Sequence, residues 1–169
     1  IILTKTGLES LEHFSDFKME DNEIAWITES GVNFCAQAFT TVGYDHPDSP
    51  ILAVLGKVLH NGYLHSAIRE KGGAYGSGAM QDVNAGLFKF FSYRDPNTEE
   101  TFNSFNASIE WAVKSITENH LEQGILGIIS SIDKPASPSS EAMADLYANL
   151  SGRTSEKRKS FRDSVIHCT

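Results

Sequence analysis

The chain has 169 residues, of which 40% are hydrophobic and 21% charged, and its formal net charge is −8. This composition excludes a disordered chain and is typical of one globular domain, or of one domain with a small appendage. The acidic balance argues against a nucleic-acid partner, because nucleic-acid-binding domains usually present a basic surface.

The cysteines and the two ends of the chain indicate which compartment to expect and whether the chain is part of a longer protein. Cys35 and Cys168 lie far apart and make neither a disulfide framework nor a metal-binding spacing, so we expect a reducing compartment. No apolar run is long enough to span a bilayer, so we expect no membrane partner. Residues 1–22 are interpreted as a tail or the remnant of a preceding segment, and residues 23–169 as one domain. The start lacks an initiator Met and a signal sequence, and the end falls within a helical pattern, so we expect a fragment of a longer protein.

The first half of the predicted domain combines strands with one helix. Residues 23–28 and 32–39 favour two strands joined by a tight turn, which is a hairpin pattern. A helix is predicted from residue 50 to about residue 70, because Ser49-Pro50 is typical of a helix start and apolar residues recur at helical spacing. Gly72-Gly73 is expected to end this helix, since glycine tolerates a left-handed cap. Two further strands are predicted over residues 74–81 and 87–93.

The second half is predicted to be helical. A helix begins after Asp95-Pro96, where Asn97 and Glu100 resemble a capping box. Further helices are predicted after Thr117, over 141–150 and from 154 to about 167. Helices grouped around a mainly antiparallel sheet define an α+β domain. The buried stripe of the first of these helices is expected to consist of Phe102, Phe105, Ile109, Val113 and Ile116.

A glycine-rich stretch over residues 69–79 is the most distinctive local feature. It is not a phosphate-binding loop, because a helix is predicted before the glycines and a strand after them. A dinucleotide-binding fingerprint also fails, because Gln81 stands where its third glycine should be. The stretch does place Arg69 at the end of a helix and Tyr75 on the following strand.

Two readings of Arg69 and Tyr75 remain open at this point. In the simpler one, Arg69 is a cation that compensates the helix dipole and Tyr75 is a half-buried strand aromatic. In the other, both side chains donate hydrogen bonds to a carbonyl oxygen that becomes an oxyanion. An arginine never loses its proton, and a phenol is a neutral donor at pH 7, so both fit this role.

Other candidate chemistry is weak. None of the six histidines belongs to a His-Glu-x-x-His motif or its inverted form. His60 and His65 are five residues apart, which is a poor spacing for sharing a ligand on one helical face, so we expect this chain to bind no metal by itself. The serines lack the Gly-x-Ser-x-Gly pattern of a nucleophile, and Cys35 is expected to be a small core residue.

Two motifs together carry a family resemblance. They are Arg-Glu-Lys-Gly-Gly-Ala-Tyr-Gly over residues 69–76 and Gly-Leu-Phe-Lys-Phe-Phe-Ser-Tyr-Arg-Asp-Pro-Asn over residues 86–97. At this spacing the chain resembles the insulinase-like (pitrilysin) zinc metallopeptidases, and most closely their presequence-protease branch, over about residues 24–165.

The resemblance implies a fold and a role. Such enzymes contain four related α+β domains that form two halves around a peptide, and zinc is bound by the N-terminal half. The C-terminal half contributes an arginine and a tyrosine that grip the substrate backbone, and Arg69 and Tyr75 match these two catalytic residues. Gly72, Gly73 and Ala74 match the substrate-binding turn between them. This chain is then the last domain, with the sister domains of the same chain and a peptide substrate as partners.

The zinc motif is absent from this sequence, so the resemblance implies that zinc belongs to the full-length enzyme and that the separated domain is inactive. Exposure of the face that packs on a sister domain would allow the separated domain to dimerise. Two alternatives stay open. One is a non-catalytic peptide-docking or assembly subunit with the same fold, and the other is a free-standing binding domain. The expected location is the cytoplasm in a bacterium and an organelle matrix in a eukaryote.

Overall fold

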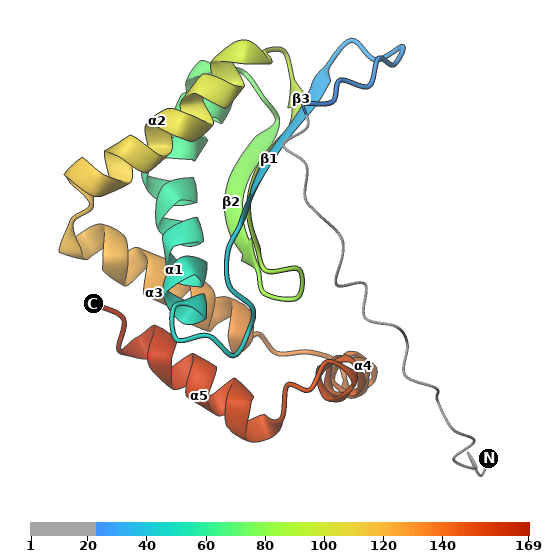
Figure 1. Cartoon of the computed structure of the whole chain (residues 1–169), viewed down its shortest axis with the longest axis vertical. Helices are drawn as coiled ribbons and strands as arrows, with labels where there is room; N and C mark the ends of the chain where they lie inside the picture. The colour runs from blue at the N-terminus through green and yellow to red at the C-terminus, as the bar shows by residue number, and fades with distance from the viewer. Residues whose placement is uncertain (1–22) are drawn as a thin grey trace.

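An antiparallel sheet of three strands forms the centre of this computed structural model, which describes residues 23–169. The strands are β1 (Asn33–Thr40), β2 (Gly76–Asp82) and β3 (Leu87–Asp95), in the spatial order β1-β3-β2 (Figure 1). Strand β3 is therefore central. Its aromatic sequence suits a position with a neighbour on both sides.

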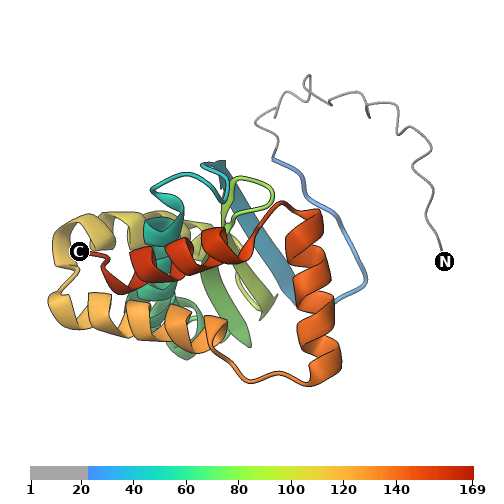
Figure 2. The ribbon, with the colours of Figure 1, turned by 90° about the horizontal axis from the view of Figure 1, so that it is seen from below.

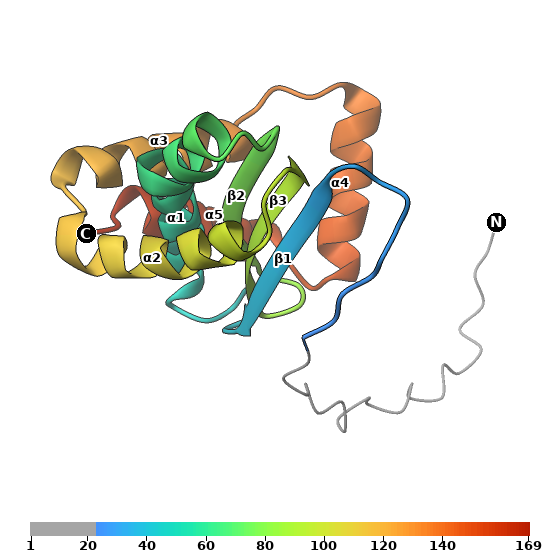
Figure 3. The ribbon, with the colours of Figure 1, turned by 90° about the horizontal axis from the view of Figure 1, so that it is seen from above.

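Helices cover one face of the sheet. Helix α1 (Ser49–Leu59) continues directly into a π-helical segment, η1 (His60–Lys71), and both pack against β2. Helices α2 (Glu99–Ser115) and α3 (Glu118–Ile132) lie on the same side of the sheet, whereas α4 (Pro138–Leu150) lies on the other side (Figures 2 and 3). The predicted α+β class is thereby confirmed. The last helix, α5 (Ser155–Ile166), packs against α1 and α3.

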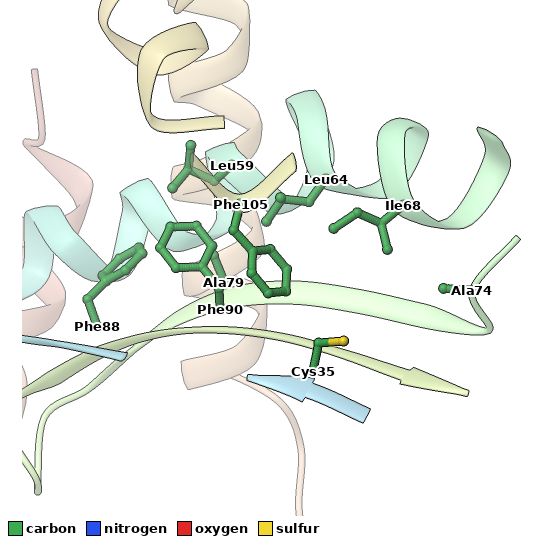
Figure 4. Close-up of a cluster of buried hydrophobic side chains, with 9 residues drawn as sticks. All are labelled: Cys35, Leu59, Leu64, Ile68, Ala74, Ala79, Phe88, Phe90 and Phe105. Carbon is green, nitrogen blue, oxygen red and sulfur yellow. The ribbon is translucent and has the colours of Figure 1, made fainter. Parts of the chain in front are cut away.

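The main core lies between the sheet and the helix layer (Figure 4). Phe90 of β3 is at its centre, with its ring centroid 5.5 Å from that of Phe105 of α2 and 5.3 Å from that of Phe88. Cys35 is a small buried member of this core, as expected from the sequence. The remaining members are Leu59, Leu64, Ile68, Ala74 and Ala79.

The predicted N-terminal hairpin is wrong. Residues 23–28 form no strand and every one of them is exposed, including Trp26 at 85% and Ile27 at 97%. A short apolar segment forms a strand only when a neighbouring strand and an apolar surface are available to pair with it and to bury it. The second predicted strand of the hairpin is present as β1.

The start of helix α1 is displaced by one residue from its predicted place, because Asp48 is the N-cap and Ser49 already lies within α1.

The predicted buried stripe of α2 is partly wrong. Phe105 is fully buried, but Ile109 is 42% exposed and Val113 is 84% exposed. Trp111 takes the inward position instead: its ring packs against Tyr63, with a centroid distance of 6.0 Å. A Cβ at Gly62 of η1 would lie 2.3 Å from the Trp111 ring, so that glycine makes room for the indole.

The face of the sheet away from α1 and α2 carries apolar side chains on all three strands. Phe34 of β1 is opposite Tyr93 of β3, and Tyr93 is opposite Gly76 of β2. The Tyr93 ring lies where a side chain of Gly76 would be, and the Phe91 ring takes the corresponding place over Gly78. The two glycines thus let aromatic rings lie over β2.

Between residues 23 and 169, no helix is long and apolar enough to cross a membrane.

Candidate functional site

The end of η1 determines where Arg69 lies. The Gly72 N–H donates to the Ala67 carbonyl at 3.1 Å, an i to i−5 bond that belongs to the π-helix. The Gly73 N–H then bonds to the Arg69 carbonyl at 3.1 Å, and Gly73 has a φ of 81°, a left-handed conformation that favours glycine. The predicted helix stop is therefore confirmed, and it leaves Arg69 exposed in the last turn.

Tyr75 follows this turn at the start of the sheet. Its N–H donates to the Arg94 carbonyl at 3.2 Å, which extends the pairing of β2 with β3 by one residue. The side chain is 61% exposed, so Tyr75 is not the half-buried aromatic of the simpler reading. The Arg69 guanidinium carbon lies 6.0 Å from the centroid of the Tyr75 ring. The structure thus brings the two predicted residues together on the surface.

Asn97 ties the turn to the rest of the domain. Its side-chain amide donates to the Gly72 carbonyl at 2.7 Å, and its backbone N–H donates to the Asp95 carboxylate at 2.9 Å. Asp95 is fully buried, and its second oxygen accepts from the Thr101 hydroxyl at 2.7 Å. Asn97 is therefore not part of a capping box as predicted: Thr98 is the N-cap of α2, and no side chain caps the helix. The amide of Asn97 holds the Arg69–Tyr75 turn instead.

Two further residues surround Tyr75. The Tyr93 ring centroid is 5.6 Å from that of Tyr75, and the Arg94 guanidinium carbon is 5.9 Å from the same centroid. We call Arg69, Tyr75, Tyr93 and Arg94 the Tyr75 cluster. Sequence reasoning did not single out Tyr93 and Arg94 as site residues, although both belong to the second family-like motif, beside Asp95-Pro96-Asn97.

Arg94 adopts an unusual backbone conformation. Its φ is 48°, and it is the one non-glycine residue with a positive φ in the part of the chain that the structure describes. A left-handed conformation costs a residue with a side chain about 1–2 kcal/mol relative to the right-handed one. A cation over an exposed aromatic ring returns about 0.5–1 kcal/mol.

The Tyr75 cluster is cationic. Over residues 23–169, no carboxylate forms an ion pair with Arg69 or Arg94, and the neighbouring Glu70 lies 3.5 Å from His65 instead. The cluster therefore offers two guanidinium groups and two phenols as hydrogen-bond donors. Such a set can bind a carbonyl oxygen and favour negative charge on it, but it contains no carboxylate or imidazole that could act as a general base.

The π-helix overturns one argument about the histidines. In a π-helix residues five apart lie on one face, unlike in an α-helix. His60 and His65 are accordingly neighbours, with ring centroids 6.1 Å apart, and His65 lies beside Glu70, again five residues on. Even so, no group of three His, Cys, Asp or Glu side chains among residues 23–169 is arranged to hold a metal ion.

The fold is that of a known class of α+β domain. The same fold occurs in a candidate zinc protease from Bordetella pertussis Tohama I, with a TM-score of 0.65 and 19% identity over 80% of both chains. It is also shared by the inactive peptidase domain of a candidate zinc protease from Bordetella parapertussis, with a TM-score of 0.67 and 16% identity. That second match covers 80% of this chain and 79% of the other.

Sequence then defines the family. Residues 22–169 match the profile of the PreP C-terminal domain, and the chain belongs to this family. It is 37% identical over 139 residues to a protein named mitochondrial presequence protease in Danio rerio, and 42% identical over 136 residues to one in Yarrowia lipolytica. These matches cover 82% and 80% of this chain but only 13% of each relative. The predicted presequence-protease branch is thereby confirmed.

Proposed function

We propose that this domain supplies the peptide-gripping residues of a zinc metalloendopeptidase that hydrolyses unstructured peptides. The observation that supports this most directly is that Arg69 and Tyr75 lie together on the surface, and that among residues 23–169 no carboxylate forms an ion pair with Arg69. The relatives are named mitochondrial presequence proteases, so we include an organelle-matrix location and peptide substrates in the proposal.

Each residue has a distinct task in this proposal. Arg69 donates N–H groups to a substrate backbone carbonyl and orients it, while the Tyr75 hydroxyl donates to the same oxygen as negative charge develops on it. The glycine turn from Gly72 to Ala74 keeps bulky side chains away from the passing backbone. Zinc, held by another domain of the full-length protein, would supply Lewis-acid chemistry; the residues described here offer it no site.

Substitution in the full-length protein tests these roles. Arg69→Ala and Tyr75→Phe should each lower kcat by about a hundredfold, because each removes one donor to the developing oxyanion. Zinc content, measured by elemental analysis, should stay at the wild-type value. Matched controls are Arg158→Ala on α5 and Tyr147→Phe on α4, which alter the same groups at exposed positions outside the Tyr75 cluster. Wild-type turnover in both test variants would remove the proposed role.

The 169-residue chain by itself should not cleave peptides. We expect no turnover of an unstructured fluorogenic peptide with or without added zinc. The domain contributes hydrogen-bond donors, but residues 23–169 contain no group of side chains arranged to hold a metal ion. Cleavage that a chelator abolishes would contradict this expectation.

A non-catalytic peptide-docking or assembly subunit with the same fold is the second candidate. It is favoured by the donor-only chemistry of the Tyr75 cluster, which suffices to bind a peptide without hydrolysing it. Metal stoichiometry in the full-length protein separates the two candidates. One zinc per chain, with chelator-sensitive turnover, supports the peptidase, and peptide binding without zinc supports the docking subunit.

A further inference from the structure

Arg94 lies in a β-bulge at the end of the sheet. Along the pairing of β1 with β3, Phe34 is opposite Tyr93 and the preceding Asn33 is opposite Asp95, so Arg94 has no partner on β1. On its other side, Arg94 accepts the hydrogen bond from the Tyr75 N–H. A bulge changes the direction in which a side chain points. Here it lets Asp95 enter the interior while the Arg94 side chain remains exposed beside Tyr75.

The backbone needs the bulge but does not need an arginine. A left-handed residue in a bulge is usually glycine, since glycine alone adopts this conformation without strain. The Arg94 guanidinium carbon lies over the Tyr75 ring, 5.9 Å from its centroid. An exposed cation–π contact contributes only about 0.5–1 kcal/mol, which is less than the strain of about 1–2 kcal/mol, so this contact does not offset the strain. Strained non-glycine residues of this kind concentrate at functional sites.

The position of Arg94 defines what it can do. The guanidinium carbons of Arg94 and Arg69 lie 5.9 and 6.0 Å from the centroid of the same Tyr75 ring. The Tyr93 ring is a third neighbour of the Tyr75 ring, with its centroid 5.6 Å away. A Tyr75 side chain that is 61% exposed would otherwise be free to rotate.

We propose that Arg94 is a positioning residue of the peptide-gripping site: it fixes the Tyr75 phenol relative to Arg69 and adds a second positive charge beside the substrate carbonyl oxygen. This inference rests on the proposed function. The ligand group is a backbone carbonyl that gains negative charge, and no bond to Arg94 forms or breaks. The charge acts on the transition state more than on the bound peptide, so Arg94 should affect kcat more than KM.

Three substitutions at one position separate the charge from the backbone. In the full-length protein, Arg94→Gly and Arg94→Asn remove the charge and suit the left-handed conformation, whereas Arg94→Lys keeps the charge. We expect Arg94→Gly and Arg94→Asn to lower kcat about tenfold with KM within about twofold of wild type. Arg94→Lys should retain most of the turnover, and millimolar guanidinium ion should restore part of the kcat of Arg94→Gly.

Thermal unfolding of the same variants tests the structural alternative. The melting temperatures of Arg94→Gly and Arg94→Asn should equal or exceed the wild-type value, because both relieve strain. Wild-type kcat in both variants would overturn the inference, and so would a loss of turnover that follows a lowered melting temperature. If Arg69→Ala and Tyr75→Phe impair turnover while Arg94→Gly does not, only the role of Arg94 fails. Normal turnover in all three would refute the proposed function itself.

Discussion

His60 lies where α1 passes into η1, and its Nδ1 atom is buried without a hydrogen-bond partner. Burial lowers the pKa of His60 below its ordinary value of 6.5, and the charges of Lys57 and His65 lower it further. The unfolded chain therefore binds a proton at a pH where the folded chain does not. Well above pH 6.5 both states are neutral at this residue, so the destabilising effect grows as the pH falls towards 6.5 and below it.

The resulting prediction concerns acid sensitivity. The free energy of unfolding of the 169-residue chain should fall between pH 7.5 and 5.5, and His60→Gln should make this fall shallower. Urea unfolding at a series of pH values measures both slopes. An identical slope in the variant would show that His60 does not contribute.

Single residues also show how far the sequence could define the site. Arg69 and Tyr75 were predictable, because the glycine turn between them is a local feature and places them at the two ends of one bend. The places of Tyr93, Arg94 and Asn97 were not, because they depend on pairing between strands and on a bulge that no local pattern indicates. Whether Arg69 and Tyr75 act in catalysis stays a prediction.

Within helix α3, substitution of two glycines by alanine should change the free energy of unfolding in opposite directions. A Cβ at Gly124 would lie 2.7 Å from Val58 and 3.2 Å from the Val54 carbonyl, both on α1, whereas the atoms nearest to a Cβ at Gly127 are those of the flexible Lys57 side chain at 3.6 Å. Gly124→Ala should therefore lower the free energy of unfolding by about 1–2 kcal/mol through overpacking. Gly127→Ala should raise it by up to about 1 kcal/mol through helix propensity.

Urea unfolding of both glycine variants at one pH tests this pair. Each variant adds the same methyl group to the same helix, so the helix propensity gain cancels in the comparison. Equal stabilities would mean that α1 and α3 do not approach each other as closely as described.

The elements themselves were predicted where local chemistry decides them. Strand β3 and the end of η1 follow from an aromatic run and from paired glycines, and both are present. The strand predicted over residues 23–28 is absent, because strand formation there would need a neighbouring strand that the local pattern cannot supply. The π-helical hydrogen bonding of η1 has no clear sequence signal, and with it the alignment of His60 and His65 escaped prediction.

At the scale of the whole molecule, apolar surface remains exposed in several places. Val113 of α2, Ile27 of the N-terminal segment and Leu150 of α4 are 84%, 97% and 75% exposed. The chain spans only 13% of the length of the Danio rerio and Yarrowia lipolytica relatives, so a longer protein of that kind would have ample sequence to cover such surfaces. Dimerisation of the separated chain through them stays a prediction.

Helix α4 stands apart from the other helices, on the far side of the sheet, and Ala148 is its one buried residue (Figure 3). With so little packing, local opening of α4 should require far less free energy than global unfolding. In hydrogen–deuterium exchange of the 169-residue chain, the amides of α4 should exchange much faster than those of α1. Protection equal to that of α1 would contradict this. If another part of the full-length protein packs on α4, the amides of α4 should exchange more slowly in the full-length protein than in the 169-residue chain.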